Sequence, residues 1–130
     1  MIVGITASRF GMSRSQTDEL AEMLMKLKPT EFHHGMCVGG DHEAHLIAQH
    51  RDIPVVGHPP IETKYMIDYS FTPLVYKYVF PALPYLDRNK AIVHCVDFLF
   101  VGARGEESLR SGTWSTKRYA QKVGCKFYIL

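Results

Sequence analysis

Short apolar runs rich in β-branched residues alternate along the chain with longer segments in which apolar side chains recur every three or four residues. The short runs predict five strands, at residues 2–6, 31–35, 53–58, 97–103 and 126–130. The longer segments predict four helices, at residues 14–28, 41–51, 85–96 and 111–124. We expect Asp41 to cap the second helix and Gly124 to end the fourth.

This alternation of strands and helices predicts an α/β fold. Short apolar strands between helices are typical of a parallel sheet that is covered on both sides. Right-handed crossovers then give a Rossmann-like, doubly wound, mainly parallel five-stranded sheet with helices on both faces. A chain of 130 residues without repeats or linkers is expected to form a single domain, residues 1–130.

Residues 61–84 interrupt the alternation, because this stretch is rich in Tyr, Phe and Pro and has no clear period. We expect an extended loop or lid that contains at most a short helix. A small domain has little room to bury so many extra large side chains, and aromatic residues are enriched in interface cores. The stretch therefore predicts a homodimer or larger oligomer; the alternative is a lid over the chain's own pocket.

Composition excludes several classes of protein. No apolar run is long enough to span a bilayer, and the first residues do not read as a signal peptide, so we expect a cytoplasmic protein. The scattered cysteines Cys37, Cys95 and Cys125 indicate reduced thiols rather than a disulfide framework. A formal net charge of +2 is small for a dedicated duplex-DNA binder, so nucleic acid is not the expected partner.

A ligand site is expected beyond the carboxyl ends of the strands, where doubly wound sheets bind their ligands. Gly39 and Gly40 precede one helix there, and residues 111–113 (Ser-Gly-Thr) open another, so backbone amides can approach an anion closely. The cation candidates in this region are Arg9, Arg88 and Arg110. These features predict a nucleotide or ribose-phosphate pocket; the alternative is that the glycine pair forms only a turn.

The histidines near the second predicted strand raise the question of a metal. The neighbouring candidates are His33, His34, Cys37, His42 and His45. Their spacing matches no standard zinc pattern, and adjacent strand residues point to opposite faces, so His33 and His34 cannot easily share one ion. We expect no structural zinc and no cofactor, and we expect His45 to be a hydrogen-bonding residue.

Four motifs together resemble the SLOG superfamily, which is named after the Smf/DNA-processing-protein-A and Lonely-guy proteins. They are VGITASRFGM, HHGMCVGGDHEAHLIA, YLDRNKAIV and RSGTWSTKRYA, and in this order they cover nearly the whole chain. The second is similar to the Gly-Gly…Asp…Ala-His…Ala signature of the DNA-processing branch. The fourth is similar to the Gly-Gly-x-Gly-Thr phosphate motif of the Lonely-guy branch.

The resemblance implies a Rossmann-like protein, similar to small stand-alone bacterial or phage members, that binds a nucleotide or a nucleotide-derived ligand. The motif positions that match the family's ligand-facing residues are Ser8, Arg9, Gly39, Gly40, Asp41, Ser111, Gly112 and Thr113. The same strand-end segments add the candidates Thr6, Gly35, His58, Arg88 and Arg110. Arg110 takes the place of the arginine expected ahead of the phosphate motif.

One departure bears on activity. Lonely-guy phosphoribohydrolases carry an acidic residue two positions after the Gly-Thr pair, and here that position is Ser115. Glu106 and Glu107 are the nearest possible substitutes. The leading hypothesis is a sensor or sequestering module for an ADP-ribose or cyclic-nucleotide type of ligand. The alternative is a nucleoside 5'-monophosphate phosphoribohydrolase that cleaves an N-glycosidic bond, and single-stranded DNA binding is the third.

Overall fold

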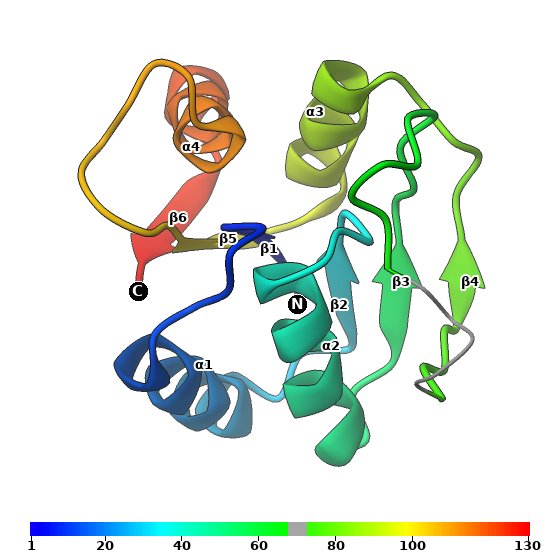
Figure 1. Ribbon diagram of the computed structural model, residues 1–130. Coiled ribbons are helices and arrows are strands. Elements are labelled where there is room, and N and C mark those ends of the chain that lie inside the picture. The colour runs from blue at the N-terminus through cyan, green and yellow to red at the C-terminus, as the bar shows by residue number, and fades with distance from the viewer. Residues whose placement is uncertain (68–72) are drawn as a thin grey trace.

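A computed structural model describes residues 1–67 and 73–130 (Figure 1). Across these residues the strands are β1 (Ile2–Ala7), β2 (Glu31–His34), β3 (Val55–Gly57), β4 (Tyr78–Val79), β5 (Phe98–Gly102) and β6 (Lys126–Ile129). The helices are α1 (Arg14–Leu27), α2 (Gly40–His50), α3 (Tyr85–Cys95) and α4 (Gly112–Val123). The predicted alternation of strands and helices is confirmed.

The strands form one parallel sheet in the order β4-β3-β2-β1-β5-β6. The prediction of five strands was wrong, because β4 adds a sixth inside the stretch 61–84. It pairs with β3 through Tyr78 and Val79 alone, and two residues are too few to show a period in the sequence. The strand order reverses between β1 and β5, which is the switch point where a doubly wound sheet binds its ligand.

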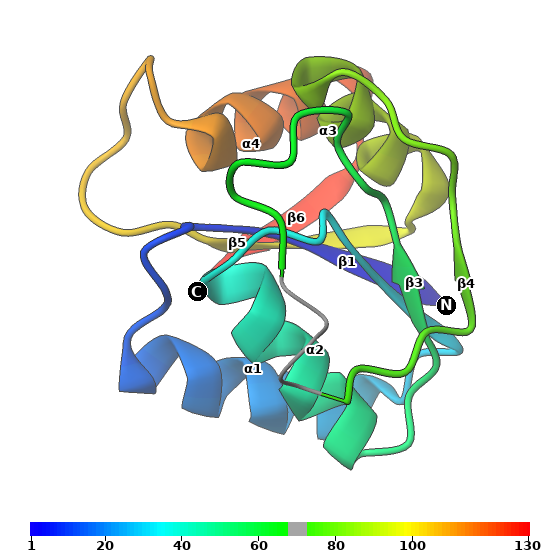
Figure 2. The same ribbon diagram turned by 45° about the vertical axis from the view of Figure 1, so that its right-hand side comes forward.

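Helices cover both faces of the sheet, as expected. Helices α1 and α2 lie on one face, and α3 and α4 lie on the other (Figures 1 and 2). Each layer has its own apolar core: Leu20 and Ala48 are fully buried against β1 and β2 on the first face. Ile92 and Ala120 pack against β5 on the second. Within the described residues, no helix combines the length and the hydropathy that crossing a membrane requires.

Local caps and turns fix the ends of the helices. Ser13 and Gln16 form a capping box at the start of α1, and Gly124 in the left-handed conformation (φ 81°) ends α4 as predicted. The prediction that Asp41 caps α2 was wrong, because Gly39 holds the cap position and makes no side-chain bond. Asp41 Oδ2 instead accepts the amides of Gly35 (3.1 Å) and Cys37 (3.2 Å), which fixes the β2–α2 turn.

The described parts of the stretch 61–84, residues 61–67 and 73–84, contain no helix. The remainder, residues 68–72, lies outside the described residues. Tyr76 packs on the ring of His45, and Phe80 stacks on the ring of His58, with centroids 4.6 and 4.5 Å apart. Tyr76 and Phe80 therefore pack on the chain's own buried histidines, whereas Tyr65 and Tyr78 are exposed. The side chains of Val75 and Val79 remain 68% and 47% exposed.

Candidate functional site

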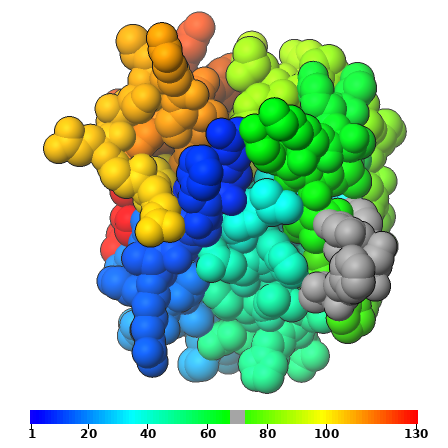
Figure 3. Space-filling view, viewed as in Figure 1, coloured from blue at the N-terminus to red at the C-terminus, as the bar shows by residue number. Residues whose placement is uncertain are grey.

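The carboxyl ends of β1 and β5 open into a cleft of about 980 Å³, which is at the upper end of the usual range for small-molecule pockets. Residues from the β1–α1 loop, the segment after β3, the start of α3 and the loop between β5 and α4 line it. Figure 3 shows three of these segments on one face: the β1–α1 loop in blue, the segment after β3 in green and the β5–α4 loop in yellow-orange. The cleft thus lies at the topological switch point of the sheet.

Most of the candidate residues from the sequence lie in this cleft. Those that line it are Thr6, Ser8, Arg9, Gly35, Asp41, Arg88, Arg110, Ser111, Gly112 and Thr113. Gly39, Gly40 and His58 are not among its lining residues. The chain therefore brings together residues that are far apart in sequence, from β1 to the start of α4.

The glycine pair has a packing role. A Cβ at Gly39 would collide with the carbonyl group of Arg9, and the φ of +83° at this residue also disfavours any side chain. The Gly40 amide donates to the Ser8 carbonyl (2.8 Å), and a Cβ there would collide with that of Ala7. The pair lets the start of α2 dock on the β1–α1 loop, so its effect on the cleft is to position that loop.

The N-terminus of α4 opens directly into the cleft. Ser111 caps the helix, its Oγ accepting the Trp114 amide (3.3 Å) and its carbonyl the Ser115 amide (2.9 Å). The amides of Gly112 and Thr113 have no acceptor in the described parts of the chain, as is usual in the first turn of a helix. These free amides and the positive end of the helix dipole make this turn suitable for binding an anion.

Basic side chains outnumber acidic ones around the cleft. The basic residues are Arg9, Lys64, Arg88, Arg104 and Arg110, against Asp41, Glu62 and Glu106. The Arg9 guanidinium lies 4.1 Å from the Tyr65 ring centroid and 5.0 Å from that of Phe10, which holds it at the mouth of the cleft. Within residues 1–67 and 73–130 it has no carboxylate partner. Its charge therefore remains available to a ligand.

Arg88 lies deeper in the cleft, and its guanidinium is already hydrogen-bonded within the chain. It is 3% exposed, and its guanidinium donates to the carbonyls of Gly35 and His58 and to the side chain of Asn89. It thereby ties α3 to the loops after β2 and β3. Burial raises the pKa of the neighbouring Asp41 to about 6, although the charge of Arg88 opposes this shift. Asp41 Oδ1 has no partner among the described residues, so the floor of the cleft contains an unsatisfied acceptor.

Aromatic surfaces complete the cleft. Trp114 could be expected from the sequence to stack a base beside the anion site, although a core position was the favoured interpretation, whereas Tyr65 and Tyr85 were not singled out. The side chains are Tyr65, from the stretch without a period, Tyr85, at the start of α3, and the largely buried Trp114. The hydroxyl group of Tyr85 lies so close to Gly112 that a Cβ there would collide with it. The indole N–H of Trp114 has no partner in the described part of the chain. Such flat surfaces beside an anion site can stack a base.

Comparison with known proteins gives the family of the fold. No family model and no curated protein matches the chain. Among solved structures, the molybdenum cofactor binding protein of Rippkaea orientalis superposes with a TM-score of 0.73 at 17% identity, over 98% of this chain and 74% of that one. The Moco carrier protein of Chlamydomonas reinhardtii superposes with a TM-score of 0.72 at 17% identity, over 99% of this chain and 75% of that one. DNA processing protein A of Helicobacter pylori superposes with a TM-score of 0.66 at 21% identity, over 99% of this chain and 64% of that one.

The chain has the fold of the SLOG superfamily. The resemblance carried by the four sequence motifs is confirmed at the level of the fold, over nearly the whole chain. At these identities the likeness extends to the fold alone. The role of the cleft must be argued from the residues of this chain.

The cleft lacks a carboxylate at the position where the resemblance to the Lonely-guy branch implies one. Ser115, at the position of the expected acidic residue, lines the cleft and supplies only a hydroxyl group. Glu107 forms ion pairs with Lys117 (3.3 Å) and Arg118 (3.1 Å) and is not a lining residue. Glu106 lines the cleft from the same loop. Glu106 is thus the member of this pair that could contact a ligand.

The buried histidines form two separate pairs on opposite faces of the sheet. His34 Nε2 and His45 Nδ1 are 2.8 Å apart on the α2 side, and His33 Nδ1 and His58 Nε2 are 2.8 Å apart on the α3 side. Burial lowers the pKa of all four rings, that of His58 to about 3, so they are neutral at pH 7. The expectation that His33 and His34 face opposite ways is confirmed, as is the hydrogen-bonding role of His45.

Proposed function

We propose that the cleft binds a phosphate-bearing nucleotide or nucleotide-derived small molecule, and that the protein acts as a sensor or sequestering module for it. The observation that carries this proposal is the first turn of α4. The free amides of Gly112 and Thr113 open into the same cleft as the unpaired guanidinium of Arg9. Backbone amides and an arginine together are a common solution for binding phosphate.

The remainder of the cleft suits a base or another flat ring. Tyr65, Tyr85 and Trp114 present aromatic surface, and the unpaired indole N–H and Asp41 Oδ1 offer one donor and one acceptor. Two neighbours with the same fold are described as binding the molybdenum cofactor, which shows that this fold can hold a small ligand. The DNA-binding neighbour, described for its single-stranded DNA binding mode, supports a different ligand. Single-stranded DNA is therefore included in the binding test.

The test is calorimetric titration of the purified protein with AMP, ADP-ribose, cyclic AMP and a single-stranded oligodeoxynucleotide, with adenosine as the control that lacks phosphate. We expect at least one phosphate-bearing compound to bind about tenfold or more tightly than adenosine, because a charge-assisted hydrogen bond contributes roughly 1.5–3 kcal/mol. Equal affinities for AMP and adenosine would contradict a phosphate site at α4. Mass spectrometry of small molecules released from the purified protein would identify a ligand outside this panel.

The enzyme alternative makes a separate prediction. A phosphoribohydrolase needs a carboxylate to stabilise the developing positive charge on the ribose, and Ser115 cannot supply one. Incubation with AMP followed by chromatography should therefore yield no free adenine in proportion to protein. If the wild type releases adenine and Glu106→Gln does not, Glu106 in the β5–α4 loop would supply the stabilising carboxylate. That result would favour the enzyme hypothesis.

We also propose that the chain forms a homodimer through the β4 edge of the sheet. Strand β4 is the outermost strand on its side, and among the described residues one of its edges is unpaired. The side chains of Val79, in β4, and of Val75, which precedes it, are exposed. Exposed edges with apolar side chains favour pairing with another chain. A symmetrical contact between two copies would cover both valines.

A further inference from the structure

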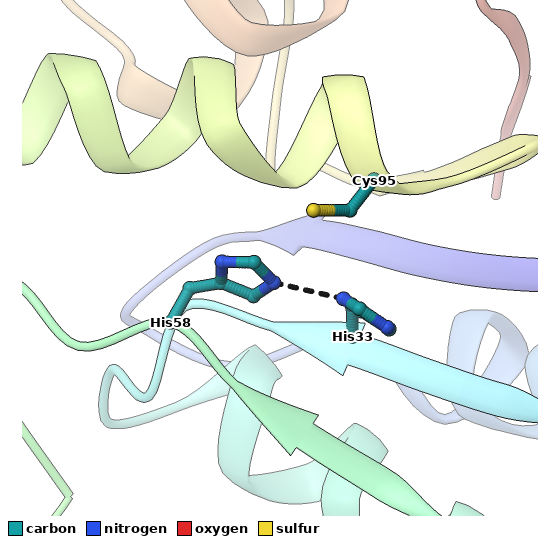
Figure 4. A group of neighbouring side chains, drawn as sticks. All are labelled: His33, His58 and Cys95. Carbon is teal, nitrogen blue, oxygen red and sulfur yellow. Dashed lines mark hydrogen bonds between the residues drawn. The ribbon is translucent and has the colours of Figure 1, made fainter. Parts of the chain in front are cut away.

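A cluster of two histidines and one cysteine lies outside the cleft, between the sheet and α3 (Figure 4). His33 comes from β2, His58 follows β3 directly, and Cys95 is the last residue of α3. Their ligand atoms, one from each side chain, all lie within 4.8 Å of one another. His33 and His58 are 2% and 3% exposed, and Cys95 is partly buried. Three elements that are distant in sequence thus present three ligand-type atoms to one point.

We propose that this cluster binds a thiophilic d¹⁰ metal ion, Zn²⁺ or Cu⁺, through His33 Nδ1, His58 Nε2 and Cys95 Sγ. Imidazole nitrogen and thiolate sulfur are the donors that such ions prefer, whereas Mg²⁺ and Ca²⁺ require oxygen ligands. Among the described residues, no fourth His, Cys, Asp or Glu joins the group. Water would therefore complete a tetrahedral Zn²⁺ site, and Cu⁺ would be held by three ligands.

A carboxylate behind His33 supports the site. His33 Nε2 lies 2.9 Å from Glu31 Oε1, and Glu31 is in turn held by Lys77 Nζ (2.7 Å) and the Tyr78 hydroxyl (3.1 Å). Metal-bound histidines usually donate their second N–H to such a carboxylate, which fixes both the ring and its tautomer. Here His33 Nε2–H donates a hydrogen bond to the Glu31 carboxylate, so Nδ1 carries a free lone pair that is directed at His58.

The protonation states are suitable for binding a metal. Burial lowers the pKa of His33 and His58, so both rings are neutral near pH 7, as ligands must be. In the metal-free protein, His58 Nε2–H donates to His33 Nδ1; metal binding moves that proton to the other nitrogen of His58. Burial also raises the pKa of Cys95, whose thiol must lose its proton to bind the ion. One proton is therefore released for each ion bound.

The geometry requires only small movements. Zinc–nitrogen and zinc–sulfur bonds of about 2.0–2.3 Å place the ligand atoms roughly 3.3–3.6 Å apart. The two ring nitrogens, now 2.8 Å apart, would separate by about half an ångström, and Sγ would move inward. The metal-free cluster is already closed by its own hydrogen bonds, so the fold does not depend on the ion. A structural zinc, which we do not expect from the histidine spacing, would instead be required for folding.

The test is titration of chelator-treated protein with Zn²⁺ in one arm and with Cu⁺ under anaerobic, reducing conditions in the other. We expect one equivalent to bind in at least one arm, with one proton released, as measured by calorimetry in buffers of different ionisation enthalpy. Co²⁺ used in place of Zn²⁺ should give a thiolate-to-cobalt charge-transfer absorption. The arm that binds identifies the ion. The failure of both arms would overturn the proposal without affecting the nucleotide cleft.

Variants assign the ligands. Cys95→Ser should abolish the charge-transfer band and weaken binding by more than about 100-fold, and Glu31→Gln should weaken binding by about 10–100-fold. The matched controls are Cys125→Ser, another partly buried free cysteine, and His50→Gln, an exposed histidine; both should bind like the wild type. His58→Gln provides a second ligand variant, and circular dichroism confirms that each variant is folded. Undiminished binding by both Cys95→Ser and His58→Gln would overturn the assignment.

Discussion

The protonation of His58 gives a stability prediction that can be worked out numerically. This ring is 3% exposed, hydrogen-bonded to His33 and stacked on Phe80. Burial is the largest cause of its pKa falling from 6.5 to about 3, and the nearby charges of His33 and Arg88 act in the same direction. Because the folded-state pKa is depressed, the contribution to stability is present above the unfolded-state pKa and is lost as the pH falls towards the folded-state value.

The magnitude follows from the two pKa values. Between pH 6.5 and about 3 the unfolded chain holds one more proton at this ring than the folded chain does. Each pH unit in that window costs about 1.4 kcal/mol, so lowering the pH from about 7.5 to about 5 should remove about 2 kcal/mol through His58 alone. The other buried histidines act in the same direction. Asp41, whose pKa is raised to about 6, acts in the opposite direction, so the overall profile does not isolate His58.

Comparison of the wild type with His58→Gln isolates the contribution of His58 to the pH dependence of stability. Glutamine preserves a donor that can reach His33 but does not titrate. The measurement is the free energy of urea unfolding at both pH values, with a chelator present to keep the cluster free of metal. The wild type should lose about 2 kcal/mol more than the variant between about pH 7.5 and about pH 5. An equal loss in both proteins would refute the reasoning, as would a His58 ring resonance that titrates within this range by NMR.

Three further predictions address packing, binding and assembly. Gly39→Ala should destabilise the protein by at least about 1 kcal/mol more than Gly105→Ala, because both have positive φ but only Gly39 would also collide with its neighbour; equal losses in urea unfolding would contradict this. Arg9→Ala and Thr113→Ala should each lower the affinity for the best-binding nucleotide about tenfold, and unchanged calorimetric affinities in both would place the ligand elsewhere. Light scattering should give a dimer that Val79→Asp dissociates, and a monomeric mass for the wild type at micromolar concentration would rule the dimer out.

The central strands and the helices could be predicted from the sequence because their signals are local. Strand β5 and the middle of strand β1 are buried, so both strands read as apolar runs. Strand β4 could not be predicted in this way. It is two residues long and exposed, and it exists because β3 offers it an edge to pair with. Its position depends on tertiary contacts of Tyr76 and Phe80 that leave no periodic pattern.

The two glycine motifs show the same limit at the site. Both Gly39-Gly40 and Gly112-Thr113 precede or open a helix at the correct edge of the sheet, so local sequence treats them alike. The structure distinguishes them. The first pair is in contact with the β1–α1 loop, and its Gly40 amide is bonded to Ser8, whereas the amides of the second open into the cleft. Which amides remain free depends on what packs against each helix end, and that is a tertiary property.

Three features can be read from the sequence alone: the layer architecture, the edge of the sheet that carries the ligand residues, and the opposite facing of His33 and His34. These follow from the two- and 3.6-residue periods of side-chain direction and from the chirality of crossovers. Three others require the folded chain. His33 lies beside His58 and Cys95, Arg88 is buried and hydrogen-bonded, and Arg9 has no carboxylate partner among residues 1–67 and 73–130. These contacts depend on long-range packing, because each partner comes from a different strand, helix or loop.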